Sequence, residues 1–332
     1  MSESMAELIP DVRESGERRA QYAEMKKTER DELFATVNSF IETVPQNLSE
    51  FSAFLNMQAT LPTSDLYNTI LTLKTMPGAQ DVRTFDAWKR AGRSILPGTH
   101  GIKTLEREQY THTQLVTSRD AFGAEQTVPI TQQRNGYTVG RVFDVSTTRG
   151  ATVPTAFTMP AKEDITASFP SFVQLAQSYG VKVYSDKEQK HRVLYDPDAR
   201  AIVIRDNMSA PEIMTALTSG LVLARIHNRE GAAFDVKAHT MESAGAAYVV
   251  CRSFGVDAPV DLAKVHAGLD GRGEKEIKAM LGNIGYHARG VGYELDKSLN
   301  PVKAASRYNF QNRQQDNQRN RRREVNRNAT SR

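Results

Sequence analysis

The sequence predicts an α+β protein with two domains, an N-terminal helical extension and a disordered basic C-terminal tail. The chain has 332 residues, of which 39% are hydrophobic and 25% charged, so it can bury the cores of two ordinary domains. Helical and strand-like patterns alternate along it, and its composition turns polar and basic after residue 300. The expected segments are the extension (1–44), a first domain (45–150), a linker (151–164), a second domain (165–300) and the tail (301–332).

The N-terminal half predicts helices followed by short strands. Residues 1–44 are dense in Glu, Arg and Lys and predict one or two solvent-facing helices that end before Pro45. Apolar residues recur at helical spacing from Leu48 to Leu73, with a break at Pro62. Residues 82–145 predict short strands and loops.

The second domain begins with a helix and a small sheet. Residues 168–180 predict an amphipathic helix that its last glycine ends. Strands are expected over 181–186 and over 191–206, the latter as a hairpin that turns at Asp196-Pro197-Asp198. Three or four helices should follow, up to about Tyr293.

The composition also restricts the cellular compartment. No apolar run reaches the roughly 18 to 20 residues of a membrane span, and the first residues are too polar for a signal peptide. The chain has a single cysteine, Cys251, so an internal disulfide framework is excluded. Because Cys251 lies in an apolar run, we expect it to be a small core residue. We expect a cytoplasmic protein with no membrane partner.

The tail differs in charge from the rest of the chain. Residues 301–332 hold nine Lys or Arg and two acidic residues, whereas the first 300 residues carry a small net negative charge. A segment rich in Arg, Asn and Gln buries too little to fold, but it can contact phosphates.

Twelve residues occur in the order and spacing of a known family. They are Asn68, Pro77, Ala79, Trp88, Gly92, Arg93, Gly98, Gly101, Ile102, Phe143, Asp144 and Ser146. Residues 48–148 therefore resemble the N-terminal domain of ArdC-type antirestriction proteins and of related LtrC-like proteins of mobile elements. The sequence departs from the family pattern at Thr75 and Thr147, where Gln is usual or frequent. The resemblance implies a domain that binds single-stranded DNA.

A cluster of basic residues surrounds Trp88, the only tryptophan of the chain. Proteins that bind single strands pair a positive groove with aromatic rings, and each stacked base contributes about 1–3 kcal/mol. Together with the resemblance, this favours a binding surface with Trp88 as a stacking platform. The alternative is a core tryptophan beside a solvated charged face. The expected contacts are Trp88, Lys89, Arg90, Arg93, His100 and Lys103, with Arg321, Arg322 and Arg323 from the tail.

Residues 192–227 and 241–257 resemble the metallopeptidase-type domain that follows in the same family. In such a domain two histidines, four residues apart on one helix, hold zinc together with a later glutamate. A further glutamate between the histidines activates the bound water. In this chain Leu217, Leu221 and His227 match the packing positions of that helix.

The chemical positions of that helix are replaced. Ser219 stands for the first histidine, Gly220 for the general base and Leu223 for the second histidine, whereas Glu242 keeps the third ligand position. A lone carboxylate does not hold a catalytic zinc against water, so we expect no enzyme activity and no cofactor. Gly220 also costs about 1 kcal/mol relative to alanine inside a helix. The resemblance implies that this helix kept its packing residues and lost its metal site.

These features predict a single-stranded nucleic-acid-binding protein of a plasmid or phage in a bacterial host, related to antirestriction or DNA protection. RNA and duplex DNA remain alternative ligands, and the second domain is an expected contact for a protein partner. One alternative is an active metallohydrolase with a rewired site, in which His227, His239 and Glu242 would converge. The other is a structural or virion-associated scaffold.

Overall fold

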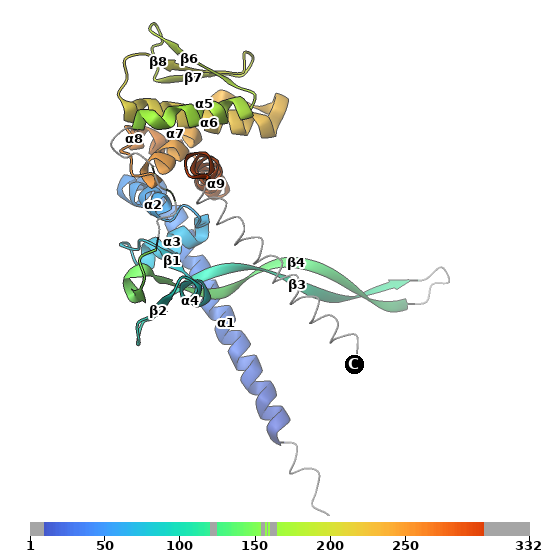
Figure 1. Ribbon diagram of the computed structural model, residues 1–332. Coiled ribbons are helices and arrows are strands. Elements are labelled where there is room, and N and C mark those ends of the chain that lie inside the picture. Colours follow the sequence, from blue (N-terminus) through green and yellow to red (C-terminus); the bar gives the residue numbers. More distant parts are fainter. Residues whose placement is uncertain (1–9, 120–124, 154–156, 158, 160–164, 302–332) are drawn as a thin grey trace, which may run out of the picture. The chain divides into compact units, whose positions relative to one another are not determined.

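The computed structural model describes residues 10–119, 125–153, 157, 159 and 165–301 (Figure 1). They form helices and three small sheets, so the α+β fold class is confirmed. The described residues cluster into two compact units. Unit 1 draws on residues 1–44 and 67–153, and unit 2 on residues 45–66 and 154–332.

Unit 1 is built on one long helix and one long β-hairpin. Its elements are α1 (Pro10–Thr43), α3 (Leu66–Thr75), β1 (Val82–Arg83), α4 (Phe85–Arg90), β2 (Arg93–Ile95), β3 (Ile102–Arg119), β4 (Glu125–Asp144) and β5 (Thr148–Gly150). Strands β3 and β4 pair antiparallel from Ile102 opposite Val142 to Arg119 opposite Glu125. The base of this hairpin contacts α1, where Phe34 packs edge-on against Tyr137.

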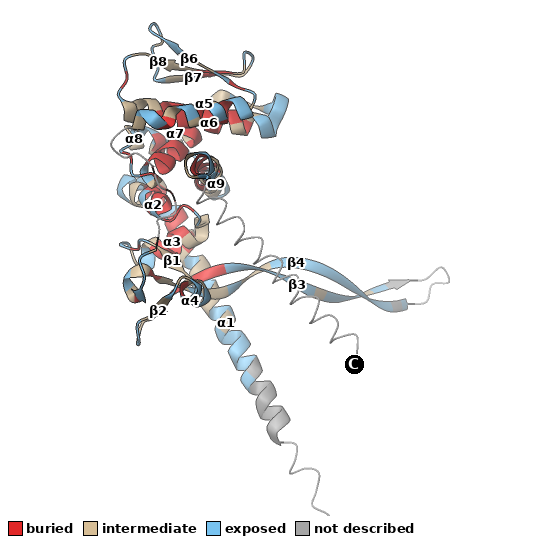
Figure 2. Ribbon diagram, in the orientation of Figure 1, coloured by how far each residue is buried: buried red, intermediate tan, exposed pale blue. Residues whose placement is uncertain are grey.

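The hairpin is a twisted ribbon whose outer part is exposed to solvent on both faces (Figure 2). We expected short strands here, and the difference has a physical cause. Strands that bury neither face need no alternation of apolar and polar residues, so the periodic signal is missing.

Unit 2 consists of a small mixed sheet on a layer of helices. Its elements are α2 (Leu48–Thr60), α5 (Phe169–Ser178), β6 (Lys182–Asp186), β7 (Val193–Asp196), β8 (Ala201–Arg205), α6 (Ala210–Glu230), α7 (Val236–Ser253), α8 (Leu262–His266) and α9 (Glu274–Leu299). The strand order is β6-β8-β7, with β6 parallel and β7 antiparallel to β8. Helix α6 contacts β7 and β8, and it also packs against α7 and α9 (Figure 1).

Several expected element ends agree with the structure. Helix α1 ends just before Pro45, α2 and α3 are separated around Pro62, and Gly180 follows α5 with φ of +73°. The hairpin β7–β8 turns after Asp196. Cys251 is a buried core residue, and burial raises the pKa of its thiol to about 11.

Residues 45–66 belong to unit 2, although the sequence placed them in the first domain. The reason is the apolar face of α2, where Phe51, Phe54 and Leu55 are fully buried. This helix packs against α7 and α8, and Asn56 accepts a hydrogen bond from the Tyr248 hydroxyl at 2.7 Å. Within the described part of the chain, no helix is long and apolar enough to cross a membrane.

Candidate functional site

Trp88 lies in the core of unit 1 and not on its surface. Its side chain is 0% exposed, and its indole nitrogen donates a hydrogen bond to the Phe143 carbonyl at 2.7 Å. The Arg83 guanidinium covers the ring at 4.7 Å from its centroid. No ring face is free for a base, so the expected stacking platform at Trp88 is corrected to a core anchor.

Arg93 also has a structural task. Its guanidinium donates to the hydroxyl and the carbonyl of Thr148, and to the carbonyls of Gly150 and Ala151. These four hydrogen bonds hold β2 to the end of β5, and few donors remain for a phosphate. The expected contact of Arg93 with nucleic acid stays a prediction.

Asn68 and Asp144 connect further elements of unit 1. Asn68 joins α3 to β3, because its amide donates to the Leu105 carbonyl at 3.0 Å and its oxygen accepts from the Leu105 amide at 2.9 Å. The Asp144 carboxylate accepts from the amides of Gln80, Asp81 and Ser146. Burial opposes the ionised form, but the hydrogen bonds from Ser146, Gln80 and Asp81 outweigh it and lower the pKa of Asp144.

Two of the expected nucleic-acid contacts, Lys89 and Arg90, lie on α4 and remain exposed. Thr84 caps this helix, and Lys89 and Arg90 in its last turn are exposed and form no ion pair with the described residues. Phe85 is 57% exposed and lies one helical turn before Lys89. The sequence analysis selected Trp88 and not Phe85. The tertiary fold decides which of these two rings is buried, and local sequence does not show this.

The other expected contacts differ in their surroundings. His100 is exposed, whereas Lys103 forms a salt bridge with Glu29 of α1 at 3.0 Å. Hydrogen bonds from Lys26 and Lys103 lower the pKa of Glu29 to about 2. Arg149 on β5 is an exposed cation that the sequence did not single out. Arg321, Arg322 and Arg323 lie outside the described residues.

In unit 2 the three replaced positions of α6 serve packing. The Ser219 hydroxyl lies 3.2 Å from the Ser243 hydroxyl on α7, and Leu223 is buried. A Cβ atom at Gly220 would lie 2.7 Å from the nearest side-chain carbon of Ile202 on β8. Gly220 therefore permits a close approach between helix and sheet, which explains a glycine inside this helix.

Glu242 is directed toward α9. The carboxylate is 7% exposed, and its two oxygens lie 3.2 Å from His287 Nε2 and 3.4 Å from Asn283 Nδ2. The Arg225 guanidinium, which can only donate, lies 3.4 Å from His287 Nδ1 on the other side of the ring. No sequence signal pointed to His287, because it is remote from Glu242 in the chain and matches no motif.

His239 lies beside Glu242, with its Nδ1 3.6 Å from a carboxylate oxygen, whereas among the described residues no contact joins His227 to Glu242. Phe234 stacks on both imidazoles, at 4.7 Å from His227 and 5.8 Å from His239. His227 Nδ1 accepts from Arg200, and burial followed by the Arg200 charge lowers the pKa of His227. Among the described residues, no three His, Cys, Asp or Glu side chains are placed to hold a metal ion. Ser219, Gly220, Leu223 and Glu242 form no such group within the described part of the chain.

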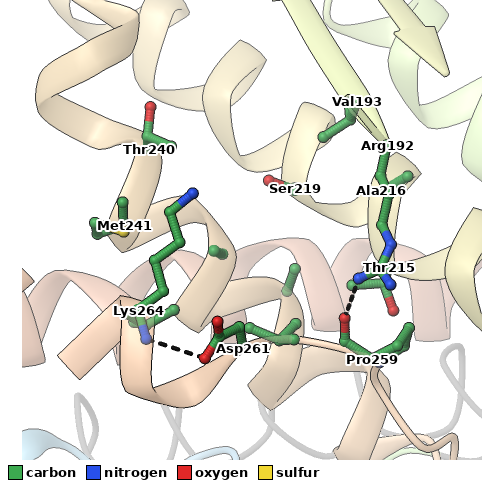
Figure 3. Close-up of a pocket in the computed structure, with 14 residues that line it drawn as sticks. Arg192, Val193, Thr215, Ala216, Ser219, Thr240, Met241, Pro259, Asp261 and Lys264 are labelled. Atoms are coloured by element: carbon green, nitrogen blue, oxygen red, sulfur yellow. Dashed lines mark hydrogen bonds between the residues drawn. The ribbon is translucent and has the colours of Figure 1, made fainter. Parts of the chain in front are cut away.

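A pocket of about 270 Å³ lies within unit 2, next to Ser219 (Figure 3). Helices α6, α7 and α8, the loop before α8 and the start of β7 form its walls. Most of its lining is aliphatic, and Lys264 extends from α8 in the direction of Ser219 and Thr240 (Figure 3).

No known protein-family model and no curated protein sequence matches the chain. Among solved structures, the chain is similar to the antirestriction protein ArdC from plasmid R388 in its metal-free form, with a TM-score of 0.40 and 15% identity. The Mn(II)-bound form of that protein gives 0.41 and 14%. Each comparison covers 70% of this chain and 84% of the other. A similarity of this size does not transfer an activity or a ligand to the present chain.

Proposed function

We propose that the protein binds single-stranded nucleic acid through the exposed face of α4. The observation that carries this proposal is the pairing of an exposed aromatic ring, Phe85, with the exposed cations Lys89 and Arg90. These three residues, which we name the α4 surface, combine in one short helix the two groups that single-strand binding requires. A base stacks on an aromatic face, and a cation neutralises a phosphate of the backbone.

The burial of Trp88 supports this assignment. Because Trp88 joins α4 to β4 and Arg93 joins β2 to β5, the α4 surface stands on a rigid base. A preorganised surface loses less entropy on binding than a mobile one. The tail residues Arg321, Arg322 and Arg323 would add phosphate contacts, as expected from the charge of that segment.

The biological setting that we propose is protection or handling of incoming DNA by a plasmid or phage, in the cytoplasm of a bacterial host. In this proposal unit 2 is a peptidase-like domain without catalytic activity, and it serves as structure or as a contact for a protein partner.

Titration of a labelled single-stranded oligonucleotide, followed by anisotropy at two salt concentrations, tests the proposed surface. Phe85→Ala should weaken binding by about 1–3 kcal/mol, the range for a lost stacked base. The double variant Lys89→Gln/Arg90→Gln should reduce the slope of log K against log salt by about 1.4, or 0.7 for each phosphate contact. Titrations with duplex DNA and with single-stranded RNA of the same sequence show which nucleic acid the protein prefers.

Matched controls come from unit 2. Tyr184→Ala removes another exposed aromatic side chain, and Lys182→Gln/Lys187→Gln removes two exposed cations. Both controls should bind like the unmodified protein. Equal losses in the control and in the α4 variants would instead indicate diffuse electrostatic binding, and unchanged binding in Phe85→Ala would remove the stacking role.

Metal content tests the proposal that unit 2 is not a peptidase. We expect no stoichiometric zinc after dialysis and no cleavage of peptide substrates, because Ser219, Gly220 and Leu223 offer no imidazole and no carboxylate. About one zinc per chain, lost in Glu242→Gln, would support the alternative of a rewired metallohydrolase.

A further inference from the structure

The pocket beside Ser219 has an aliphatic interior kept open by small side chains. Its walls include Ala216 on α6 and Ala244 and Ala247 on α7, opposite Val260 and Val265. A methyl group at each alanine leaves space that a larger side chain would fill. The volume of about 270 Å³ lies just below the roughly 300–1,000 Å³ of typical small-molecule sites. The interior is therefore suited to a small apolar group.

The hydroxyl groups that line the pocket are already occupied as donors. Thr215 donates to the Pro211 carbonyl at 2.7 Å and Thr240 to the Val236 carbonyl at 2.8 Å. Ser243 donates to the Thr240 carbonyl, so in the contact between the two serines Ser219 is the donor. None of these three lining hydroxyls keeps a hydrogen for a ligand. These hydroxyl oxygens can only accept, so an anionic group in the pocket needs a charged donor as its partner.

The charged residues of the pocket differ in whether they have partners. Arg192 donates to the Pro259 carbonyl and lies 3.3 Å from a Glu212 carboxylate oxygen. Asp261 caps α8 by accepting from the Lys264 backbone amide at 3.1 Å. The Lys264 ammonium forms no ion pair with the described residues and extends in the direction of Ser219 and Thr240 (Figure 3). It is the charged donor available to a ligand.

We propose that this pocket binds a small carboxylate with an apolar body. The apolar body lies against the alanine and valine side chains, and the carboxylate pairs with Lys264. Since the lining hydroxyls have no hydrogen to donate, Lys264 is the group that stabilises the carboxylate. This site is independent of nucleic-acid binding by unit 1, since every lining residue belongs to unit 2.

Hexanoate and its neutral analogue hexanamide, which have the same apolar body, test the proposal on the full chain. Titrations are followed through the methionine methyl resonances, with Met241 in the pocket and Met25 in α1 as an internal reference. Hexanoate should shift the Met241 resonance saturably and leave Met25 unchanged. Hexanamide should bind about tenfold more weakly, the loss expected for one charge-assisted hydrogen bond.

Three variants separate the contributions of charge and shape. Lys264→Met should reduce hexanoate affinity to that of hexanamide, whereas Lys182→Met, at an exposed lysine of β6 outside the pocket, should have no effect. Ala244→Leu should prevent binding of both compounds at an unchanged melting temperature. If Ala244→Leu unfolds the protein, the comparison of Lys264→Met with Lys182→Met still tests the proposal. No saturable Met241 shift, equal affinities for the two compounds, or unchanged binding in Lys264→Met would each overturn the proposal.

Discussion

At Gly220 the backbone of α6 approaches β8 so closely that the position has no room for a side chain. The nearest atoms are the branched side-chain carbons of Ile202, a fully buried residue with little rotameric freedom. Overpacking of this kind costs about 1–3 kcal/mol, whereas replacing a helical glycine by alanine gains only about 1 kcal/mol. The steric term therefore decides which residue is tolerated here.

A double-mutant cycle measures that steric term. Gly220→Ala should destabilise unit 2 on its own, and in an Ile202→Ala background the same change should become stabilising by up to about 1 kcal/mol. Urea unfolding of the four proteins gives the coupling energy. Additive effects of the two changes would mean that α6 and β8 adjust without cost, contrary to this view.

Asp144 should make the stability of unit 1 depend on pH in the acid range. The pKa of its carboxyl is lower in the folded protein than its usual value of 3.8. Its stabilising contribution is therefore complete above about pH 4–5 and is lost as the pH falls through the folded pKa. Asp144→Asn should cost about 1.5–3 kcal/mol at pH 7, the range for hydrogen bonds to a charged group, and clearly less at pH 3. Urea unfolding at both pH values checks this, and a constant difference between the two proteins would contradict it.

Residue identity and spacing revealed the pattern from Asn68 to Ser146, but they did not reveal which of its members face solvent. Trp88 and Arg93 are chemically suited to bind nucleic acid, and in the fold they bind the protein itself. Phe85, three residues before Trp88, has the exposed ring. Hydrogen bonds to Phe143 and Thr148, more than fifty residues away, decide the matter, and local sequence does not contain them.

At the scale of the elements, the β3–β4 hairpin is long relative to the part of it that packs against other elements. Strand β3 has 18 residues and is therefore about 60 Å long. Near its outer end Leu115 is 67% exposed, and Val128 and Ile130 are also exposed. A two-stranded ribbon without a covered face is marginally stable, so its order must depend on its base, where Tyr137 contacts Phe34 and Tyr67.

Shortening the hairpin should leave unit 1 folded. Tyr110 and Arg134 are direct partners in the register, so a two-residue Asn-Gly turn can join them in place of residues 111–133. The melting temperature should barely change, because the described residues of the removed part are largely exposed. Tyr137→Ala at the base should instead destabilise by at least about 1 kcal/mol. Unfolding of the shortened protein, measured by circular dichroism, would show that the outer ribbon carries stability.

Elements with one clear periodicity could be predicted from the sequence. Helix α1 before Pro45, helix α5 before Gly180 and the hairpin that turns after Asp196 all have local stop or turn signals. The partner of α2 could not be predicted, because an apolar helical face does not specify which surface covers it. Helix α7, which covers it, lies nearly two hundred residues further along the chain.

At the scale of the whole molecule, the chain passes back and forth between the two units. It contributes residues 1–44 to unit 1, 45–66 to unit 2, 67–153 again to unit 1 and the remainder to unit 2. A fragment that ends at residue 153 therefore contains α2 but none of α7 and α8, against which α2 packs.

This fragment should be poorly soluble, because Phe51, Phe54 and Leu55 lose their cover. Changing all three to serine should make the fragment soluble, whereas the same changes in the full chain should destabilise unit 2 severely, since each buried side chain lost costs several kcal/mol. Light scattering of the fragments and thermal unfolding of the full chains measure both effects. A soluble, monomeric fragment with the original three residues would contradict the expectation.

Because of the same interleaved path, the ribosome synthesises α2 long before the helices that pack against it. Helix α2 emerges early, but the first residue of α7 is added 176 residues later than the last residue of α2. At roughly 5–20 residues per second, that interval is on the order of ten to thirty seconds. During this interval unit 1 can fold, but the apolar face of α2 has no partner to pack against because α7 has not yet been synthesised. The nascent chain thus offers chaperones a defined binding segment, and slow translation between residues 66 and 236 would prolong the most aggregation-prone stage of its production.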